Sequence, residues 1–441
     1  MGDVRRIALR LLEGWERDDT YLNLALNSPA TASLSSAERG FLTALLYGTV
    51  ERKITLDYLI SRVAARSELA PGTRNILRLG FYQLFFMTNV PAHAAVDLTV
   101  SLASGRGERG FINGVMRSAL RQFASPDGTV SLPFPARERG LARYLSVAYS
   151  FPPNLVKHFL DLYGGDETEK LLAAFDSESP LTLAVNTLKT GREELAARFE
   201  GAGIRATPTK YSPLGLILSD APPVSSLPGF AEGLFFVQDE AAQLAAEILD
   251  PKPGMTVIDP CAAPGGKSFA AAIKTGDRGK VCAFDLHDSK LPLISDGAAR
   301  LGLASISVAA RDGLDPDPAL FGKCDRVICD VPCSGLGVLG KKPDLRYRAL
   351  DRASELPALQ SALLSASANY LAPGGRLLYS TCTLNPTENR AVVAEFLKDD
   401  PAFHLVPFSC GGLDAPAGDL TLVPHIHGTD GFYYALIEKN G

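Results

Sequence analysis

The chain has 441 residues, which is too long for one ordinary hydrophobic core, so we expect two or three domains. Its composition of 46% hydrophobic and 21% charged residues is typical of a globular protein, no apolar run approaches the ~20 residues that cross a bilayer, and the net charge of −5 excludes a uniformly basic nucleic-acid binder. Charged residues at Arg10 and Glu13 interrupt the N-terminal segment, which excludes a secretory signal peptide and predicts a cytoplasmic protein with no membrane partner.

Residues 1–124 are predicted to form helices throughout. Ile7, Leu11 and Trp15 repeat at helical spacing, and the short connections that follow indicate a compact all-α bundle. Residues 1–145 carry 18 Lys and Arg against 13 Asp and Glu, whereas the rest of the chain carries 26 against 36. A basic module joined to an acidic one fits RNA docking on the first and chemistry on the second. Further helices are expected near Ser36, Thr55, Pro71, His93 and Arg109.

Residues 125–135 are rich in Pro, Gly and Ser, so we place a linker there. Residues 136–235 then mix the two periodicities. Helices are expected over 155–163 and 193–201, and strands over 181–185 and 216–218. This segment is predicted to be a small α+β domain.

From residue 236 to the end of the chain, near-continuous apolar strands alternate with helical stretches. This pattern predicts an α/β domain with a parallel, doubly wound, Rossmann-like sheet. In such folds ligands bind outside the carboxyl ends of the strands. The expected strands are 256–259, 280–285, 305–309, 326–330 and 375–381.

A glycine-rich turn follows the first of these strands. Residues 259–267 (DPCAAPGGK) lead directly into a helix, where backbone N–H groups can bind an anionic group of a ligand. A Walker loop would need glycine at the position of Cys261, and the dinucleotide fingerprint G-x-G-x-x-G is absent. The turn therefore indicates a small ligand of another kind.

Two carboxylates follow the next two strands. Asp285 ends the second strand, where an acidic residue commonly binds the paired hydroxyls of a ribose. Asp312 follows the third strand, where it can reach the edge of an adenine. Either residue alone would usually be a loop residue or a helix cap, but together they indicate a nucleoside ligand.

Cysteines follow the fourth and fifth strands, Cys333 in the sequence DVPCSG and Cys382 in STCT. The two strands are expected to be neighbours, so both thiols can face one cleft. A thiolate that adds to C6 of cytosine makes C5 nucleophilic enough to accept a methyl group. Asp330, beside the first thiol, can bind or protonate N3 of the base.

The remaining cysteines do not indicate a metal or disulfide framework. A cytosolic chain rarely contains disulfides, and the sequence has no C-x-x-C pair, so we expect no metal site.

Two further segments flank the cysteines. Lys341, Lys342, Arg346 and Arg348 form a basic cluster that we interpret as a candidate contact to substrate phosphates, and Asn385 to Glu388 (NPTE) is interpreted as a helix start with a capping box.

With these motifs in place, the chain resembles the RNA cytosine-5 methyltransferases of the Sun/RsmB group. The resemblance covers nearly the whole chain: residues 1–124 are similar to a NusB-like RNA-binding domain, 136–235 to the small RRM-like extension of this family, and 236–441 to its methyltransferase domain. It implies S-adenosyl-L-methionine as the cofactor, a small-subunit ribosomal RNA cytidine as the substrate, and a monomer. The cofactor contacts it implies are Cys261, Ala262, Ala263, Pro264, Gly265, Gly266, Lys267, Asp285, Asp312 and Asp330.

The resemblance also implies separate roles for the two thiols. Cys382 would be the nucleophile, Cys333 would help to release the methylated product, and Asp330 would lie near the target base. In the DNA cytosine enzymes the Pro-Cys residue attacks instead, so the reverse order stays open. Two other functions remain as alternatives: a transfer-RNA cytosine-5 methyltransferase and a non-catalytic RNA-binding assembly factor. An exocyclic-amine methyltransferase would need Asn or Asp followed by Pro-Pro and an aromatic residue, which the sequence after Asp330 lacks.

Overall fold

The computed structural model describes residues 2–18, 21–66, 68–125, 129–177 and 179–441. The chain packs as two compact units, Met1–Asp176 with Lys342–Tyr347, and Ser177–Lys341 with Arg348–Gly441. Part of the expected linker, residues 126–128, lies outside the described residues. None of the described helices has the length and apolar character that a membrane span requires.

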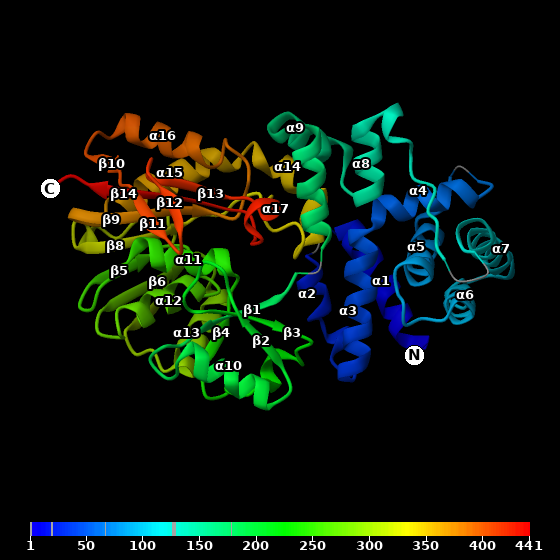
Figure 1. Ribbon diagram of the computed structural model, residues 1–441, viewed down its shortest axis with the longest axis horizontal. Coiled ribbons are helices and arrows are strands. Elements are labelled where there is room, and N and C mark those ends of the chain that lie inside the picture. Colours follow the sequence, from blue (N-terminus) through cyan, green and yellow to red (C-terminus); the bar gives the residue numbers. More distant parts are fainter. Residues whose placement is uncertain (1, 19–20, 67, 126–128, 178) are drawn as a thin grey trace. The chain divides into compact units, whose positions relative to one another are not determined.

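The first unit is all-helical, as the sequence predicts for residues 1–124 (Figure 1), and it also contains residues 136–176, which the sequence pattern places in the α+β segment. Ser35 and Glu38 close a capping box at the start of α3, and leucines on several helices form one buried core. Gly164 has a φ of 75° and interrupts α9. The helices are α1 (Gly2–Asp18), α2 (Leu22–Leu26), α3 (Ser36–Glu51), α4 (Lys53–Val63), α5 (Pro71–Phe85), α6 (Ala92–Val100), α7 (Arg106–Phe123), α8 (Leu141–Tyr149) and α9 (Pro153–Asp176).

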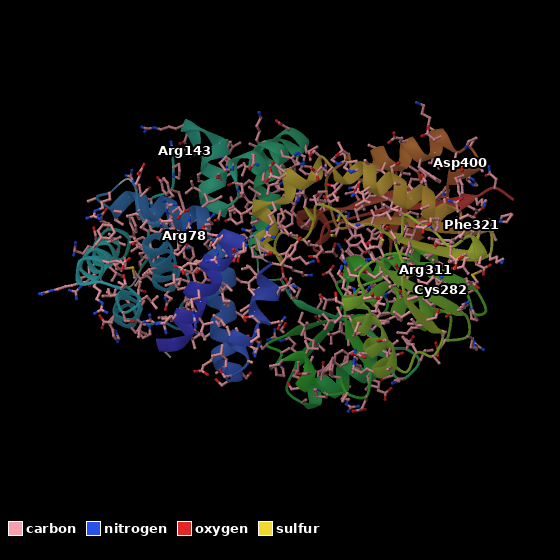
Figure 2. The ribbon with its side chains drawn as sticks, turned by 180° about the vertical axis from the view of Figure 1, so that it is seen from behind. Arg78, Arg143, Cys282, Arg311, Phe321 and Asp400 are labelled. Atoms are coloured by element: carbon pink, nitrogen blue, oxygen red, sulfur yellow. The ribbon has the colours of Figure 1, made fainter. Side chains whose placement is uncertain are left out.

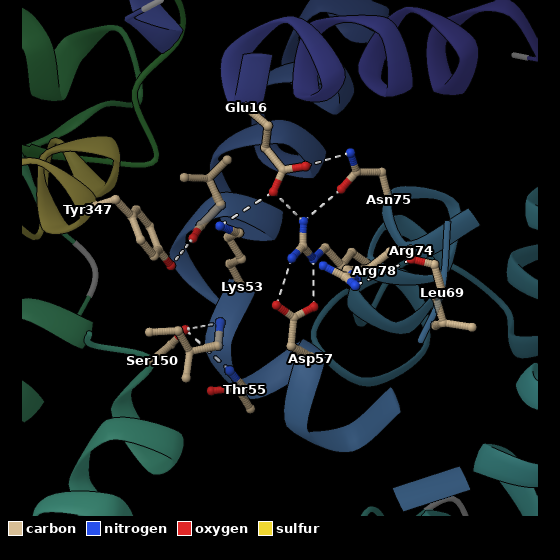
Figure 3. Close-up of polar contacts among 12 residues, drawn as sticks. Glu16, Lys53, Thr55, Asp57, Leu69, Arg74, Asn75, Arg78, Ser150 and Tyr347 are labelled. Atoms are coloured by element: carbon tan, nitrogen blue, oxygen red, sulfur yellow. Dashed lines mark hydrogen bonds and ion pairs between the residues drawn. The ribbon is translucent and has the colours of Figure 1, made fainter. Parts of the chain in front are cut away.

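A polar network crosses the core of this unit (Figure 3). The buried Arg78 guanidinium donates to both carboxylate oxygens of Asp57, at 2.7 and 2.6 Å, and to Glu16 at 2.6 Å. Lys53 lies 3.4 Å from Glu16 and 4.9 Å from the ring centroid of Tyr347. A buried guanidinium is tolerated here because its N–H groups donate to two carboxylates, one on each of two edges.

The second unit contains a small antiparallel sheet in the order β2-β3-β1-β4. Strands β1 (Leu181–Val185) and β3 (Gly215–Ser219) coincide with the predicted strands, and α10 (Arg192–Gly201) with the predicted helix. Buried residues of β1, α10 and β4 pack into one core. The sheet is completed by β2 (Arg205–Pro208) and β4 (Phe235–Val237).

The larger sheet of the second unit has eight strands, with β10-β14-β9-β8-β5-β6-β7 in order and β13 paired to β14. Strands β5 to β9 are mutually parallel, which confirms the predicted doubly wound core. Their bounds are β5 (Thr256–Asp259), β6 (Lys280–Asp285), β7 (Ile306–Ala310), β8 (Cys324–Asp330) and β9 (Leu371–Thr381).

The C-terminal strands make the sheet mixed, a feature that the sequence analysis did not identify. Strand β14 (Phe432–Lys439) pairs antiparallel with β9, and β10 (Phe403–Leu405) and β13 (Asp419–Leu422) pair antiparallel with β14. A short hairpin of β11 (Phe408–Cys410) and β12 (Leu413–Ala415) lies between them in sequence. An antiparallel edge on a parallel sheet is common in large α/β domains.

Helices cover both faces of the large sheet (Figure 1). Residues of α11, α12 and α13 pack with one face, and residues of α15 and α16 with the other. Alternation along β6 follows this division, since Val281 faces the first set and Cys282 the second. The helices are α11 (Glu240–Leu249), α12 (Gly266–Lys274), α13 (Leu291–Leu301), α14 (Ala349–Ala353), α15 (Leu356–Ala368), α16 (Arg390–Asp399) and α17 (Pro424–His427).

Candidate active site

Polar residues gather at the carboxyl-terminal edge of the parallel strands. Asp259, Asp285 and Asp330 are the last residues of β5, β6 and β8, and Cys382 directly follows β9. The register of β8 on β9 places Asp330 opposite Ser380. Because parallel strands end at the same edge, residues that are up to 123 positions apart in the sequence meet there.

The turn between β5 and α12 brings the main chain close to this edge. Gly265 has a φ of 109°, and its N–H donates to Ala262 O at 2.7 Å. A Cβ at this glycine would lie 2.4 Å from the Phe269 ring, so a side chain is excluded both by conformation and by space. Helix α12 begins at Gly266, and its first N–H groups are therefore available to a ligand.

The Asp285 carboxylate binds the main chain of two loops, the turn after β5 and the loop after β6. Its two carboxylate oxygens accept from Ala263 N at 3.2 Å and from His287 N at 3.1 Å. Arg311, labelled in Figure 2, donates its main-chain N–H to Asp285 O at 3.0 Å and places its guanidinium 5.0 Å from the centroid of the Phe284 ring. The neighbouring loop after β7 is thereby attached to the end of β6.

Asp312 is less deeply placed than the other predicted site residues. Its side chain is exposed and accepts from Leu314 N at 2.9 Å, as in a turn cap. The next residue, however, lies against the glycine-rich turn, since a Cβ at Gly313 would be 3.9 Å from the Cys261 sulfur. The structure therefore brings the loop of Asp312, rather than its carboxylate, to the turn.

Asp330 and Lys267 form an ion pair that the sequence analysis did not predict. Lys267 Nζ donates to Asp330 Oδ2 at 2.7 Å, and Ser380 Oγ donates to Asp330 Oδ1 at 2.7 Å. Lys267 Nζ also lies 5.1 Å from the centroid of the Phe432 ring. Burial lowers the pKa of Lys267, but the charge and hydrogen bond of Asp330, together with the charges of Asp259 and Cys382, outweigh it and raise this pKa, so the lysine stays a cation.

The buried carboxyl of Asp259 lies next to this pair. One of its oxygens accepts from Ser268 Oγ at 2.7 Å, while Oδ1 is buried and makes no well-formed hydrogen bond to the described residues. Burial raises the pKa of Asp259 to about 7. A buried acceptor with a free oxygen is suited to a donor group of a ligand.

The two cysteines at the strand ends are in contact. Cys333 Sγ lies 3.1 Å from Cys382 Sγ, and both residues are partly exposed. The hydrogen bond to Cys382, followed by burial, raises the pKa of the Cys333 thiol well above its ordinary range. The expectation that both thiols lie together is thus met in the geometry. The other cysteines are Cys282, Cys324, Cys329 and Cys410, which are buried, and Cys261, which is partly exposed.

Main-chain contacts fix the loop that carries Cys333, residues 331–341. The N–H of Val331 donates to Ser380 O at 3.2 Å, and the N–H of Gly337 donates to Cys382 O at 2.9 Å. Gly337 O in turn accepts from Gly431 N at 2.8 Å. A Cβ at Gly337 would lie 2.0 Å from Gly431 O, so this close approach of two main chains requires glycine.

The interpretation of Lys341, Lys342, Arg346 and Arg348 as a phosphate-binding cluster is wrong for three of its members, of which Arg348 is buried. Lys341 Nζ makes ion pairs with Asp239 and Asp430. Arg346 is buried in the helical unit, where its guanidinium lies 4.0 Å from the Phe151 ring centroid. These cations stabilise the fold and do not form one exposed patch.

The expected helix start at Asn385 to Glu388 is also wrong. Residues 386–389 form turns, and α16 begins at Arg390. The Glu388 side chain is 0% exposed and binds the Cys333 loop through Ser334. The sequence contains one signal for this, an acidic residue six positions after Cys382 in a segment that is otherwise uncharged up to Glu388.

Three protein-family models match the chain. They are described as "16S rRNA methyltransferase RsmB/F" over residues 246–438, "NusB family" over residues 3–121, and "Methyltr_RsmF/B-like, ferredoxin-like domain" over residues 151–225. The matches cover the large sheet, most of the helical unit, and α9 with most of the small sheet.

Whole-chain relatives agree with these matches. The probable ribosomal RNA small subunit methyltransferase B of Synechocystis sp. (strain PCC 6803) is 39% identical, with 100% of both chains covered. The probable ribosomal RNA small subunit methyltransferase B of Bacillus subtilis (strain 168) is 35% identical, with 99% of both covered. The crystal structure of PH0851 is 28% identical, covers 99% of this chain and 98% of its own, and superposes with a TM-score of 0.79.

Proposed function

Because the chain belongs to the RsmB/F family of 16S rRNA methyltransferases, we propose that it methylates C5 of a specific cytidine in small-subunit ribosomal RNA, with S-adenosyl-L-methionine as the methyl donor. One observation carries the proposal: two thiols, Cys333 and Cys382, at the ends of neighbouring parallel strands with their sulfur atoms 3.1 Å apart. Methyl transfer to C5 needs one thiol to activate the ring, and a second thiol beside it can act in the later elimination. The names of the two curated relatives support ribosomal RNA as the substrate.

We propose that the turn after β5 and the ends of β6 and β7 bind the cofactor. The bare main chain at Gly265 allows a close approach, and the free oxygen of Asp259 fits an ammonium group. Asp285 is placed to accept from ribose hydroxyls, because a carboxylate can accept further hydrogen bonds beside the two that it has. When bound, S-adenosyl-L-methionine supplies an electrophilic methyl group. The proposed contacts are Asp259 and the residues expected from the sequence, which are Cys261, Ala262, Ala263, Pro264, Gly265, Gly266, Lys267, Asp285, Asp312 and Asp330.

In the proposed first step the Cys382 thiolate adds to C6 of the cytosine. The new S–C6 bond takes the place of the C5–C6 double bond, whose electrons move toward C5 and make it nucleophilic. Lys267 provides the only positive charge that is hydrogen-bonded to Asp330 among the described residues. Asp330 is thereby oriented toward the N3 edge of the ring, where its carboxyl would have to carry a proton and give it to N3 as negative charge develops there.

After methyl transfer, the proposed role of Cys333 is in release. A base, such as water, removes the proton from C5, and the electrons of that C–H bond restore the C5–C6 double bond. The S–C6 bond breaks at the same time, and the Cys333 thiol gives its proton to the departing Cys382 sulfur. Proton return across the 3.1 Å contact regenerates the Cys382 thiolate and the Cys333 thiol.

We propose three domains for these tasks, with the bounds expected from the sequence. Residues 1–124 would dock RNA, 136–235 would form the extension, and 236–441 would carry the chemistry. The two compact units of the fold are a coarser division and do not decide the boundary at residue 136.

A matched pair of substitutions tests the chemistry. Cys382→Ser is expected to abolish both methylation and the covalent adduct with RNA that contains 5-fluorocytidine. Cys333→Ser is expected to form an adduct with ordinary cytidine RNA that persists, because the departing sulfur has lost its proton donor. Adduct formation by Cys382→Ser and none by Cys333→Ser would contradict this order of roles. Bisulfite sequencing of ribosomal and transfer RNA from cells with and without the gene would identify the substrate class.

A further inference from the structure

Glu388 is a fully buried carboxylate at the junction of the two cysteine-bearing segments. It lies between β9 and α16, and its side chain is 0% exposed. The N–H of Ser334, next to Cys333, donates to Glu388 Oε2 at 2.8 Å, and the Ser334 hydroxyl donates to Oε1. The residue after Cys333 is therefore attached to this carboxylate by both main chain and side chain.

Two amide side chains complete the environment of Glu388. Gln360 Nε2, from α15, donates to Oε2 at 3.0 Å and also to Pro332 O at 2.9 Å. Asn385 Nδ2 donates to Oε1 at 3.0 Å. Both carboxylate oxygens accept hydrogen bonds. A protonated carboxyl would need an acceptor for its O–H group, so the geometry fits the ionised form. All four donors are neutral, and the negative charge is not cancelled within this cluster.

Different charged groups act on the two thiols. The Lys267 cation and the Cys382 sulfur influence each other electrostatically, since the charge of Cys382 is among the causes that raise the pKa of Lys267. The pKa of the Cys333 thiol is raised first by the hydrogen bond to Cys382 and by burial, and then by the charges of Cys382, Glu388 and Asp330. A cation near one sulfur favours its thiolate, and an anion near the other favours its thiol.

We propose that Glu388 is a positioning residue for Cys333: through Ser334 it fixes the Cys333 loop beside Cys382, and its charge adds to the Cys382 contact and to burial in favouring the thiol form of Cys333. This inference rests on the proposed function and adds a reason for the division of roles. In this division Cys382 attacks because the Lys267 cation acts on its sulfur, and Cys333 retains the proton that the release step needs because the Glu388 carboxylate holds the next residue, Ser334.

The first test is Glu388→Gln, which keeps the shape and removes the charge. An amide NH2 would then face an N–H donor, so part of the anchor of the loop is lost. With cytidine RNA we expect the covalent adduct to form and its release to slow about tenfold, the effect of losing one hydrogen bond to a charged group, while cofactor affinity stays within about twofold. The matched control is Glu395→Gln, an exposed glutamate on α16. Release by Glu388→Gln at the rate of this control would overturn the proposal.

The second test does not depend on methylation. In a Cys382→Ser background, alkylation of Cys333 by iodoacetamide is followed by mass spectrometry of the peptide. Removal of the anion should lower the pKa of the Cys333 thiol and so increase the fraction of Cys333 that is present as thiolate. Glu388→Gln should therefore react on the order of tenfold faster at neutral pH than the same background with Glu395→Gln. An unchanged rate would contradict the electrostatic part of the proposal, whether or not the methyltransferase chemistry is as we propose.

A third variant serves if Glu388→Gln does not fold. Gln360→Met, on a different helix, removes the hydrogen bonds to Glu388 and to Pro332 O at similar volume. It should slow release in the same direction, about threefold, with cofactor affinity retained. Unaltered release in this variant would count against the anchor. If Cys333→Ser itself fails to accumulate an adduct, the proposed function fails, and the alkylation experiment still decides the role of Glu388.

Discussion

The Cys333 and Cys382 sulfur atoms lie 3.1 Å apart although the two residues are 49 positions apart in the sequence. The contact arises because β8 and β9 are adjacent and parallel, and because the Gly337 N–H donates to Cys382 O and turns the loop back over the strand end. A proton can therefore pass directly between the two thiols, and an oxidant can join the same two sulfur atoms in a disulfide.

Oxidation of the pair is expected to inactivate the protein reversibly. Hydrogen peroxide converts two thiols into a disulfide and two molecules of water, and the two sulfur atoms need to move only about 1 Å closer to reach bonding distance. Methylation should be lost on treatment with peroxide and restored by dithiothreitol. Mass spectrometry should find a Cys333–Cys382 cross-link in the wild type. Inactivation without this cross-link would show that another thiol is the sensitive one.

Gly265→Ala is expected to destabilise the protein and to weaken cofactor binding. Alanine at this position adopts a left-handed conformation and also meets the Phe269 ring at 2.4 Å. Together these effects should lower the free energy of unfolding by about 3 kcal/mol and the cofactor affinity at least tenfold, on the order expected for strain plus overpacking.

The matched control is Gly254→Ala. Gly254 has a φ of 89° but no atom near its Cβ position, so only the conformational part should be lost, about 1 kcal/mol. Urea unfolding and calorimetric titration with S-adenosyl-L-methionine measure both quantities. Equal effects of the two substitutions would mean that the Phe269 contact is unimportant.

Asp259→Asn is expected to change stability in a pH-dependent way. Burial raises the pKa of Asp259 to about 7 in the folded protein, so between its unfolded pKa and pH 7 the folded chain binds a proton that the unfolded chain does not. This contribution is fully present at low pH and is lost as pH rises through 7. Asparagine imitates the protonated form at every pH.

The variant should therefore gain stability relative to the wild type between pH 5 and pH 8, by roughly 2–4 kcal/mol. Urea unfolding at the two pH values measures the difference. Asp296→Asn, at an exposed position of α13, is the control and should show no such trend. A constant difference between Asp259→Asn and the wild type across this range would refute the assignment.

Arg346→Ala is expected to destabilise the helical unit. Arg346 is 2% exposed, donates to Glu51, and lies over the Phe151 ring. Its loss removes a buried cation that packs on the Phe151 ring and leaves the partly exposed Glu51 carboxylate without this partner, which together cost about 2 kcal/mol. Thermal unfolding should show the loss, whereas Lys342→Ala, exposed in the same segment, should have little effect. Similar unfolding temperatures for the two variants would contradict the structural role of Arg346.

Local sequence patterns were sufficient to predict the parallel sheet and the strand ends. Strands β5 and β6 begin and end where the apolar runs do, since each run is bounded by a turn residue and an aspartate. The position of Cys333 and Cys382 after adjacent strands followed from the alternation of strands and helices. The carboxyl ends of a parallel sheet meet by topology, so proximity there could be inferred without side-chain detail.

Features that depend on three-dimensional packing were not predictable in the same way. Nothing local distinguishes Lys267 as the partner of Asp330, 63 positions away, or Glu388 as the anchor of Ser334. The NPTE segment has the residues of a helix start, but Glu388 accepts hydrogen bonds from Ser334 and Gln360, which are distant in the sequence, and makes no capping box. Strand β14 was missed because its antiparallel pairing with β9 is a long-range contact.

The six residues Lys342–Tyr347 pack with the helical unit, although the residues before and after them belong to the other unit. Tyr347 donates to Val50 O at 2.9 Å, and its ring lies 5.5 Å from the ring centroid of Trp15. During synthesis the helical unit emerges from the ribosome first, but it cannot complete its core until residue 347 has been added. The first part of the chain to be made is therefore finished only after most of the second has been translated, which ties the maturation of the helical unit to the synthesis of the Cys333 loop.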